Sequence, residues 1–231
     1  MSEVARSPRA LVIGGFGALG TSIAAQLAAD GSDVLRSSRT PRPGSPGAVI
    51  LPADGSVTGL PTLHAVVWAQ GMNVNDSIAT FSDRDLSQIL EANVALVARQ
   101  MRSLIEAERL ITGARLVVVS SIWANAARPG KFTYTVSKAA ISGLVRAAAL
   151  DLAGRGVLVN AVLPGPVDTP MTRAMLSARQ IEEFERSTGH HRLIRPEAVA
   201  TLVSYLCSPL NTGVSGQSLV VDLGYSIGHQ V

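Results

Sequence analysis

Cysteine, aromatic residues and long hydrophobic runs are all scarce in this 231-residue sequence. The single Cys207 cannot form an intramolecular disulfide, and no Cys/His cluster has zinc-site spacing, so disulfide frameworks and structural metals are excluded. No apolar run approaches the ~18 residues of a membrane span. The apolar run after Arg9 stops at Gly14, which is too short for a secretory signal. These absences predict a cytoplasmic protein without a membrane segment.

Charge of either sign is also sparse. Lys and Arg number 20 against 17 for Asp and Glu, and aromatic residues make up 4%. Nucleic-acid binding usually needs a basic stripe with aromatic stacking platforms. We therefore expect a mildly basic surface with a local anion site and no nucleic-acid partner. Hydrophobic residues make up 47% of the sequence, which in a chain of this length is enough for a core that needs no disulfide or structural metal to stabilise it.

Short apolar runs alternate with longer segments of helical periodicity. Strands that are continuously apolar are expected where helices cover both faces of a parallel sheet. The pattern predicts an α/β fold, one doubly wound Rossmann domain over residues 1–231 with a seven-stranded parallel sheet. The predicted strands are 10–13, 33–35, 48–51, 65–68, 116–119, 157–159 and 218–221, and the predicted helices are 18–30, 83–107, 133–154, 172–187 and 196–208.

Two links lack the crossover helices that such a sheet normally has. Residues 39–47 contain three prolines, and residues 53–62 contain two glycines and a proline, which rule out long helices. We predict shortened crossovers after the second and third strands. That half of the sheet would then be thinly covered, and we expect its edge to rest on a partner subunit in a homodimer or homotetramer.

A glycine-rich loop follows the first predicted strand and precedes a predicted helix. Residues 15–20 match G-x-G-x-x-G. Such glycines turn the backbone tightly and let it approach a pyrophosphate at the helix N-terminus. Glycines alone could mark any strand-to-helix turn, but this context favours dinucleotide binding. The predicted cofactor contacts in this loop are Gly14, Phe16, Gly17, Leu19 and Gly20.

The second predicted strand ends without an acidic residue. An acid there would bind the ribose 2′-hydroxyl of NAD(H), whereas an Arg suits a 2′-phosphate. Ser38 and Arg39, with Arg42 as a further candidate, therefore predict a preference for NADP(H), with NAD(H) as the alternative. These arginines could instead be ordinary solvated loop charges.

Tyr134 and Lys138 lie four residues apart in a predicted helix, so both side chains can reach one cleft. An ammonium beside a phenol favours the phenolate and lowers the pKa of the Tyr for proton transfer. The spacing alone is common by chance. Its specificity comes from Ser121, which follows a predicted strand 13 residues before Tyr134.

With Asn93 placed 28 residues before Ser121, the sequence resembles the short-chain dehydrogenase/reductase family over nearly the whole chain. The resemblance implies that Tyr134 acts as general acid and base and that Ser121 hydrogen-bonds the reacting oxygen. It implies that Lys138 lowers the pKa of Tyr134 and holds the nicotinamide ribose. Asn93 would support a water-linked proton path to Lys138.

The resemblance also implies cofactor contacts outside the glycine loop, at Asp54 for the adenine and at Gly71, Tyr134, Lys138, Pro164, Gly165, Val167 and Thr169. The family's Asn-Ala-Gly triplet reads Ala69-Gln70-Gly71 here, which removes an Asn that normally steadies the central strands. Ile13 and Ala18 are also unusual in the glycine loop. None of these departures touches the four catalytic candidates.

For the substrate pocket, we expect Trp123 and Met171 as lining residues and residues 172–192 as a lid, although the lid's apolar residues could equally form a packed helix. No metal site is expected. The sequence predicts an NADPH-dependent oxidoreductase that reduces a small-molecule ketone or aldehyde to an alcohol, or runs the reverse reaction. The alternative is a non-catalytic nucleotide- or ligand-binding regulatory protein, because fold does not determine function.

Overall fold

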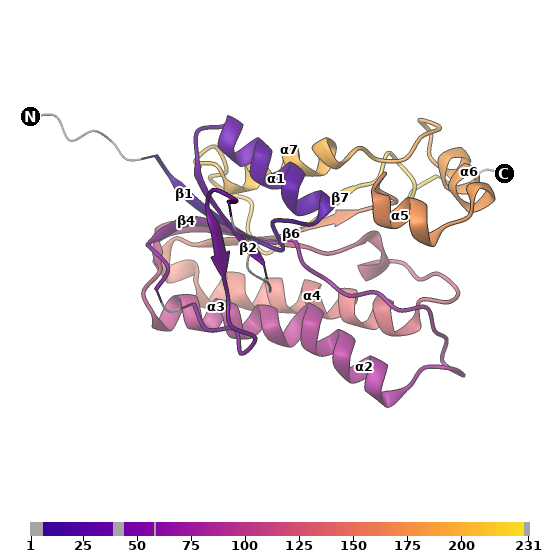
Figure 1. The fold of residues 1–231 in the computed structure, drawn as a ribbon, viewed down its shortest axis with the longest axis horizontal. Helices are drawn as coiled ribbons and strands as arrows, with labels where there is room; N and C mark the ends of the chain where they lie inside the picture. The colour runs from indigo at the N-terminus through magenta and orange to yellow at the C-terminus, as the bar shows by residue number, and fades with distance from the viewer. Residues whose placement is uncertain (1–6, 39–43, 58, 229–231) are drawn as a thin grey trace, which may run out of the picture.

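A computed structural model describes residues 7–38, 44–57 and 59–228, apart from the side chains of Met171 and Met175. The seven predicted strands form one parallel sheet in the order β3-β2-β1-β4-β5-β6-β7 (Figure 1). Their bounds are β1 Arg9–Ile13, β2 Asp33–Ser38, β3 Ala48–Ile50, β4 Leu63–Trp68, β5 Leu110–Val119, β6 Leu158–Pro164 and β7 Ser218–Val221. The predicted fold class is confirmed.

Helices cover both faces of the sheet (Figure 1). α1 (Ala18–Ala29) and α7 (Pro196–Cys207) lie on one face, and α3 (Leu96–Glu106) and α4 (Phe132–Asp151) lie on the other. Successive side chains of β1 enter different cores: Leu11 and Ile13 pack with α3 and α4, whereas Ala10 and Val12 pack with α1 and α7. Two apolar layers explain why the strands have no polar face.

Two strands, β5 and β6, extend furthest beyond their predicted bounds. β5 begins six residues before the predicted start, in a stretch that Gly113 interrupts with a φ of 79°. β6 continues through Asn160, which breaks the apolar run in the sequence. The Asn160 amide is buried and satisfied, because its Nδ2 donates to Val214 O at 2.7 Å and its Oδ1 accepts from Gln217 N at 3.1 Å.

Two predicted helices are interrupted. The segment predicted as 83–107 consists of α2 (Asp83–Leu90), a π-helical turn (Glu91–Ala95) and α3. The segment predicted as 172–187 consists of α5 (Pro170–Met175) and α6 (Ala178–Ser187), because Leu176 and Ser177 are extended. Apolar periodicity continues across both breaks, so it could not reveal them.

The shortened crossovers lie where the sequence predicts them. Within the described parts of 39–47 and 51–62, the chain forms no helix. β3 has only three residues, and Ile50 at its end is 56% exposed. No helix in the described ranges combines the length and the apolar character that crossing a membrane would require.

Candidate active site

The glycine loop joins β1 to α1 at the carboxyl edge of the sheet. Gly14 has a φ of 75° and accepts a hydrogen bond from Gly17 N at 3.1 Å. A Cβ at Gly20 would lie 2.2 Å from Gly14 O, so this turn requires glycine. A Cβ at Gly17 would meet only Gly14 O, at 3.5 Å, and α1 has no side-chain cap. The helix N-terminus therefore has open space and unpaired N–H groups, which fit a dinucleotide pyrophosphate.

Arg36 of β2 braces this loop, a role that the sequence analysis missed. Its Nε and Nη2 donate to Gly15 O at 2.8 and 2.6 Å, and its Nη2 also donates to Thr21 Oγ1 at 3.0 Å. The guanidinium lies 4.2 Å from the centroid of the Phe16 ring. Ser38 ends the same strand, whereas Arg39 and Arg42 lie outside the described residues.

The structure brings Ser121, Tyr134 and Lys138 together. Ser121 follows β5 and caps a 3₁₀ turn, where its Oγ accepts from Trp123 N at 3.3 Å. Tyr134 and Lys138 lie in the first two turns of α4, and Lys138 Nζ is 5.5 Å from the centroid of the Tyr134 ring. Ser121 and Lys138 are buried, and Ser121 forms a hydrogen bond with Tyr134.

The predicted lowering of the pKa of Tyr134 is not found. Burial of the phenol raises its pKa, and the hydrogen bond with Ser121 opposes this rise only in part. Burial also lowers the pKa of Lys138 to about 8. Lys138 Nζ donates to Val119 O at 3.4 Å, and its charge is itself disfavoured by burial, so it is a weaker source of positive potential than the spacing suggests.

Asn93 lies in the π-helical turn and connects three segments. Its Oδ1 accepts from Met72 N at 2.7 Å, and its Nδ2 donates to Met72 O and to Ser137 Oγ, both at 3.0 Å. A Cβ at Gly71 would lie 3.4 Å from Asn93 Oδ1 and 3.5 Å from Lys138 Nζ. Gly71 thus leaves space between the two side chains, where a small molecule such as water fits.

The segment after β6 forms one wall of a cavity of about 460 Å³ that also reaches Ser121 and Tyr134. Four predicted cofactor contacts from this segment line it: Pro164, Gly165, Val167 and Thr169. Leu19 of the glycine loop lines it too. Asp54, the predicted adenine contact, is exposed, and its Oδ1 accepts from Ser56 N at 2.8 Å.

Aromatic rings also line the cavity. Trp123 lines it and packs edge-on against Tyr225, with ring centroids 6.1 Å apart. Phe184 of α6 also lines it and lies 5.6 Å from Tyr225. The side chain of Met171, the other predicted pocket residue, is outside the described part of the chain.

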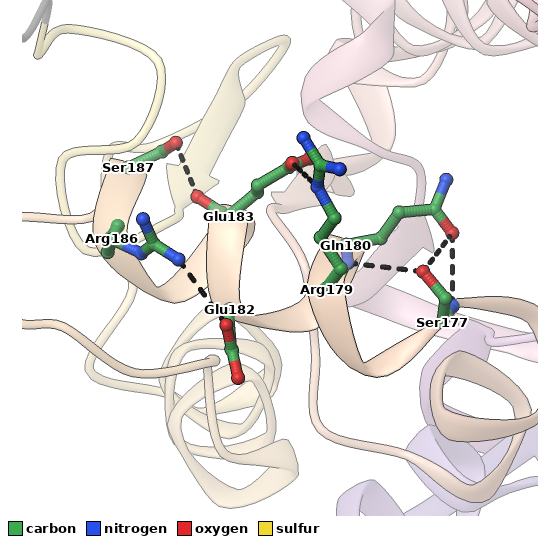
Figure 2. A network of polar contacts seen from close by, with 7 residues as sticks. All are labelled: Ser177, Arg179, Gln180, Glu182, Glu183, Arg186 and Ser187. Carbon is green, nitrogen blue, oxygen red and sulfur yellow. Dashed lines mark hydrogen bonds and ion pairs between the residues drawn. The ribbon is translucent and has the colours of Figure 1, made fainter.

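α6 contributes Gln180 and Phe184 to the cavity lining, and side chains along the helix form polar contacts with one another (Figure 2). Ser177 and Gln180 form a capping box at its start, and Gln180 also lines the cavity. The pairs Arg179–Glu183 and Arg186–Glu182 are each spaced four residues apart along the helix. α6 is thus a helix with its own cap and ion pairs that lines part of the cavity.

Four polar residues that line or flank the cavity were missed in the sequence: Asn73, Asn75, Arg128 and Lys131. Arg128 and Lys131 lie between Ser121 and Tyr134 in the chain. Because Ser121 and Tyr134 meet at one site, the loop that joins them must lie beside that site. Their positions in the sequence could therefore have indicated that Arg128 and Lys131 lie near the cavity.

Comparison with known proteins gives consistent matches. A family profile described as Enoyl-(Acyl carrier protein) reductase matches residues 53–226. Dehydrogenase/reductase SDR family member 4 of Homo sapiens is 31% identical over 239 residues, covering 93% of this chain and 86% of that protein. Cyclopentanol dehydrogenase of Comamonas testosteroni is 34% identical over 165 residues, covering 71% and 66%. The solved structure of a short-chain dehydrogenase/reductase from Serratia marcescens superimposes with a TM-score of 0.85 at 25% identity, covering 97% of this chain and 100% of that one.

Proposed function

Because the chain belongs to the short-chain dehydrogenase/reductase family and is an NAD(P)-dependent oxidoreductase of alcohol and carbonyl groups, we propose that it reduces a ketone or aldehyde with NADPH. The observation that carries this proposal is that Ser121 and Tyr134 line one cavity, which Leu19 at the start of α1 also lines, while Lys138 Nζ lies 5.5 Å from the centroid of the Tyr134 ring. The reverse reaction, alcohol oxidation, uses the same groups.

In this proposal, Tyr134 donates its phenolic proton to the carbonyl oxygen during reduction. Its raised pKa keeps the phenol protonated at neutral pH, which suits a general acid. Ser121 hydrogen-bonds the same oxygen and stabilises the charge that develops on it. The bound nicotinamide supplies the hydride.

Lys138 and Asn93 hold and resupply the proton. Lys138, with a pKa of about 8, can exchange a proton near neutral pH. The space beside Gly71 lies between Lys138 Nζ and Asn93 Oδ1 and provides a place for a bridging water. The glycine loop would hold the pyrophosphate, and Pro164, Gly165, Val167 and Thr169 would hold the nicotinamide end.

The NADPH preference rests on the charge at the end of β2. Ser38 ends β2, and Arg39 follows it in sequence at a position where an acid would reject a 2′-phosphate. Arg36 adds a cation within β2. Arg36 also steadies the glycine loop through Gly15 O. The adenosine end of the site is therefore basic.

We further propose that residues 172–192 act as a substrate lid and that the protein functions as a cytoplasmic homodimer or homotetramer. The cavity lining by Leu176, Gln180 and Phe184 supports the lid. The thin β3 edge, with Ile50 exposed, supports assembly. Crystal structures with and without cofactor test whether residues 172–192 act as a lid. Light scattering in solution tests the oligomeric state.

The direct test is the loss of reduced-nicotinamide absorbance with NADPH and NADH in parallel, across aliphatic, aromatic, β-keto and cyclic carbonyls. We expect turnover of at least one carbonyl class, with a higher kcat/KM for NADPH. Replacing Arg39 by Asp should reverse the cofactor preference, because a carboxylate repels the 2′-phosphate and accepts from the ribose hydroxyls. A preference for NADH in the unmodified protein would contradict the cofactor assignment.

A further inference from the structure

Two cations at the cavity have no carboxylate in a salt bridge with them within the described part of the chain. Arg128 and Lys131 both line it, and no lining residue is Asp or Glu. Among the described residues, neither side chain takes part in a salt bridge. Partly buried cations are costly when unpaired, so a cavity with two of them favours an anionic ligand.

Arg128 is held in an orientation that suits carboxylate binding. Its guanidinium lies 4.9 Å from the centroid of the Phe184 ring, and that ring packs against Tyr225. Stacking uses the face of the guanidinium and leaves its in-plane N–H groups available. Those groups match the two oxygens of a carboxylate. The aromatic wall therefore orders the Arg128 side chain before any ligand arrives.

Lys131 is fixed beside the catalytic Tyr. Its Nζ donates to Asn73 Oδ1 at 2.8 Å and to Asn75 Oδ1 at 2.5 Å, and it lies 5.7 Å from the centroid of the Tyr134 ring. Both acceptors are neutral amides. Because an ammonium has three N–H donors, one remains after these two bonds.

The nearby carboxylates among the described residues form their direct hydrogen bonds and ion pairs with other groups. Burial and the charge of Arg128 lower the pKa of Lys131, and Asp76 only opposes this effect. The Asp76 oxygens already accept from Thr133, one from the backbone N at 3.0 Å and the other from the side-chain hydroxyl. On α6, Glu182 and Glu183 pair with arginines of the same helix (Figure 2).

We propose that the carbonyl substrate carries a carboxylate, which Arg128 and Lys131 bind while its carbonyl oxygen lies at Ser121 and Tyr134. The assignment rests on the proposed carbonyl reduction and specifies its substrate class. Binding one end of the molecule at the cations orients the other end toward the proton donor. Neutral ketones of the same shape are then poorer substrates.

The first experiment compares acids with their methyl esters as substrates: 4-acetylbenzoate with methyl 4-acetylbenzoate, and 4-oxopentanoate with its methyl ester. We expect kcat/KM to favour the acids by about 10- to 100-fold, the range for hydrogen bonds to charged groups. In Arg128→Gln and Lys131→Gln this ratio should collapse toward one. Residual ester turnover reports that each variant is folded.

Arg102→Gln is the matched control. It removes the same charge from an exposed position on α3, where Arg102 pairs with Glu106 and does not line the cavity. The acid-to-ester ratio should be unchanged in this variant. Equal kcat/KM for acids and esters in the unmodified protein, or a ratio that survives both cavity variants, overturns the proposal.

A binding experiment separates this proposal from carbonyl reduction itself. Benzoate and benzamide have no ketone or aldehyde group, and their binding to the protein with NADP⁺ is measured by calorimetry. Benzoate that binds more tightly than benzamide, with the difference lost in Arg128→Gln, supports the anion site even if no carbonyl in the panel is reduced. Equal binding, or no binding of benzoate, contradicts it.

Discussion

Asn93→Ala tests how the π-helical turn is held in place. Asn93 is 2% exposed, and its amide forms three hydrogen bonds, two of them to the backbone of Met72. Ser137 Oγ keeps another bond, to Tyr134 O at 2.8 Å, so the main loss falls on the N–H and C=O of Met72. Leaving two partly buried backbone groups unpaired costs about 3 kcal/mol.

That loss corresponds to a melting temperature lower by about 6–12 °C for a chain of this size. Thermal unfolding followed by circular dichroism, supported by urea titration, measures it. Gln88→Ala is the control, because Gln88 is exposed on α2 one turn earlier and should change stability by less than about 0.5 kcal/mol. If Asn93→Ala melts within about 1 °C of the unmodified protein, the hydrogen-bond network is not what holds this turn.

Four other substitutions test the site. The pKa of Lys138 is about 8 in the folded protein and ordinarily 10.5, so between pH 8 and pH 10 the unfolded chain binds more protons at this residue. The free energy of unfolding should therefore rise from pH 8 to pH 10, and urea titrations at pH 8 and pH 10 should show a smaller rise for Lys138→Met. Gly17→Ala should fold normally but bind NADPH more weakly by calorimetry. Gly20→Ala should unfold more easily, because its added methyl group would lie 2.2 Å from the backbone oxygen of Gly14; equal stability of the two variants would contradict the loop geometry. Gly165→Ala places a methyl group 2.8 Å from the Asp222 Cβ and should destabilise the protein by about 1–3 kcal/mol in urea. An unchanged urea midpoint would show that the residues around Gly165 can move to accommodate the methyl group.

The sheet was predictable because its strands are apolar on both faces, a pattern that a parallel sheet between helices requires. Strand ends were less predictable, because a glycine in β5 and a buried Asn in β6 interrupt the apolar runs without ending the pairing. The absence of the two crossover helices was predictable because proline and glycine disfavour a helix at their own positions, whatever the tertiary structure around them.

At the site, fixed spacings predicted which side chains meet, but local sequence could not predict their electrostatics. Ser121, Tyr134 and Lys138 come together as their spacing implies. The pKa of Tyr134 depends on burial by residues distant in the sequence, and its rise was therefore not foreseen. Arg36 lies just after the predicted strand 33–35 and was assigned no role, although its long side chain reaches back to the glycine loop.

The most direct test of the account is carbonyl turnover by Tyr134→Phe, with NADPH binding measured separately by fluorescence. Tyr205→Phe is the matched control, since Tyr205 lies on α7, is 42% exposed and does not line the cavity. The account predicts that Tyr134→Phe binds NADPH almost as tightly as the unmodified protein but loses turnover, while Tyr205→Phe retains both. Turnover by Tyr134→Phe at the unmodified rate would contradict the role of Tyr134 as the proton donor.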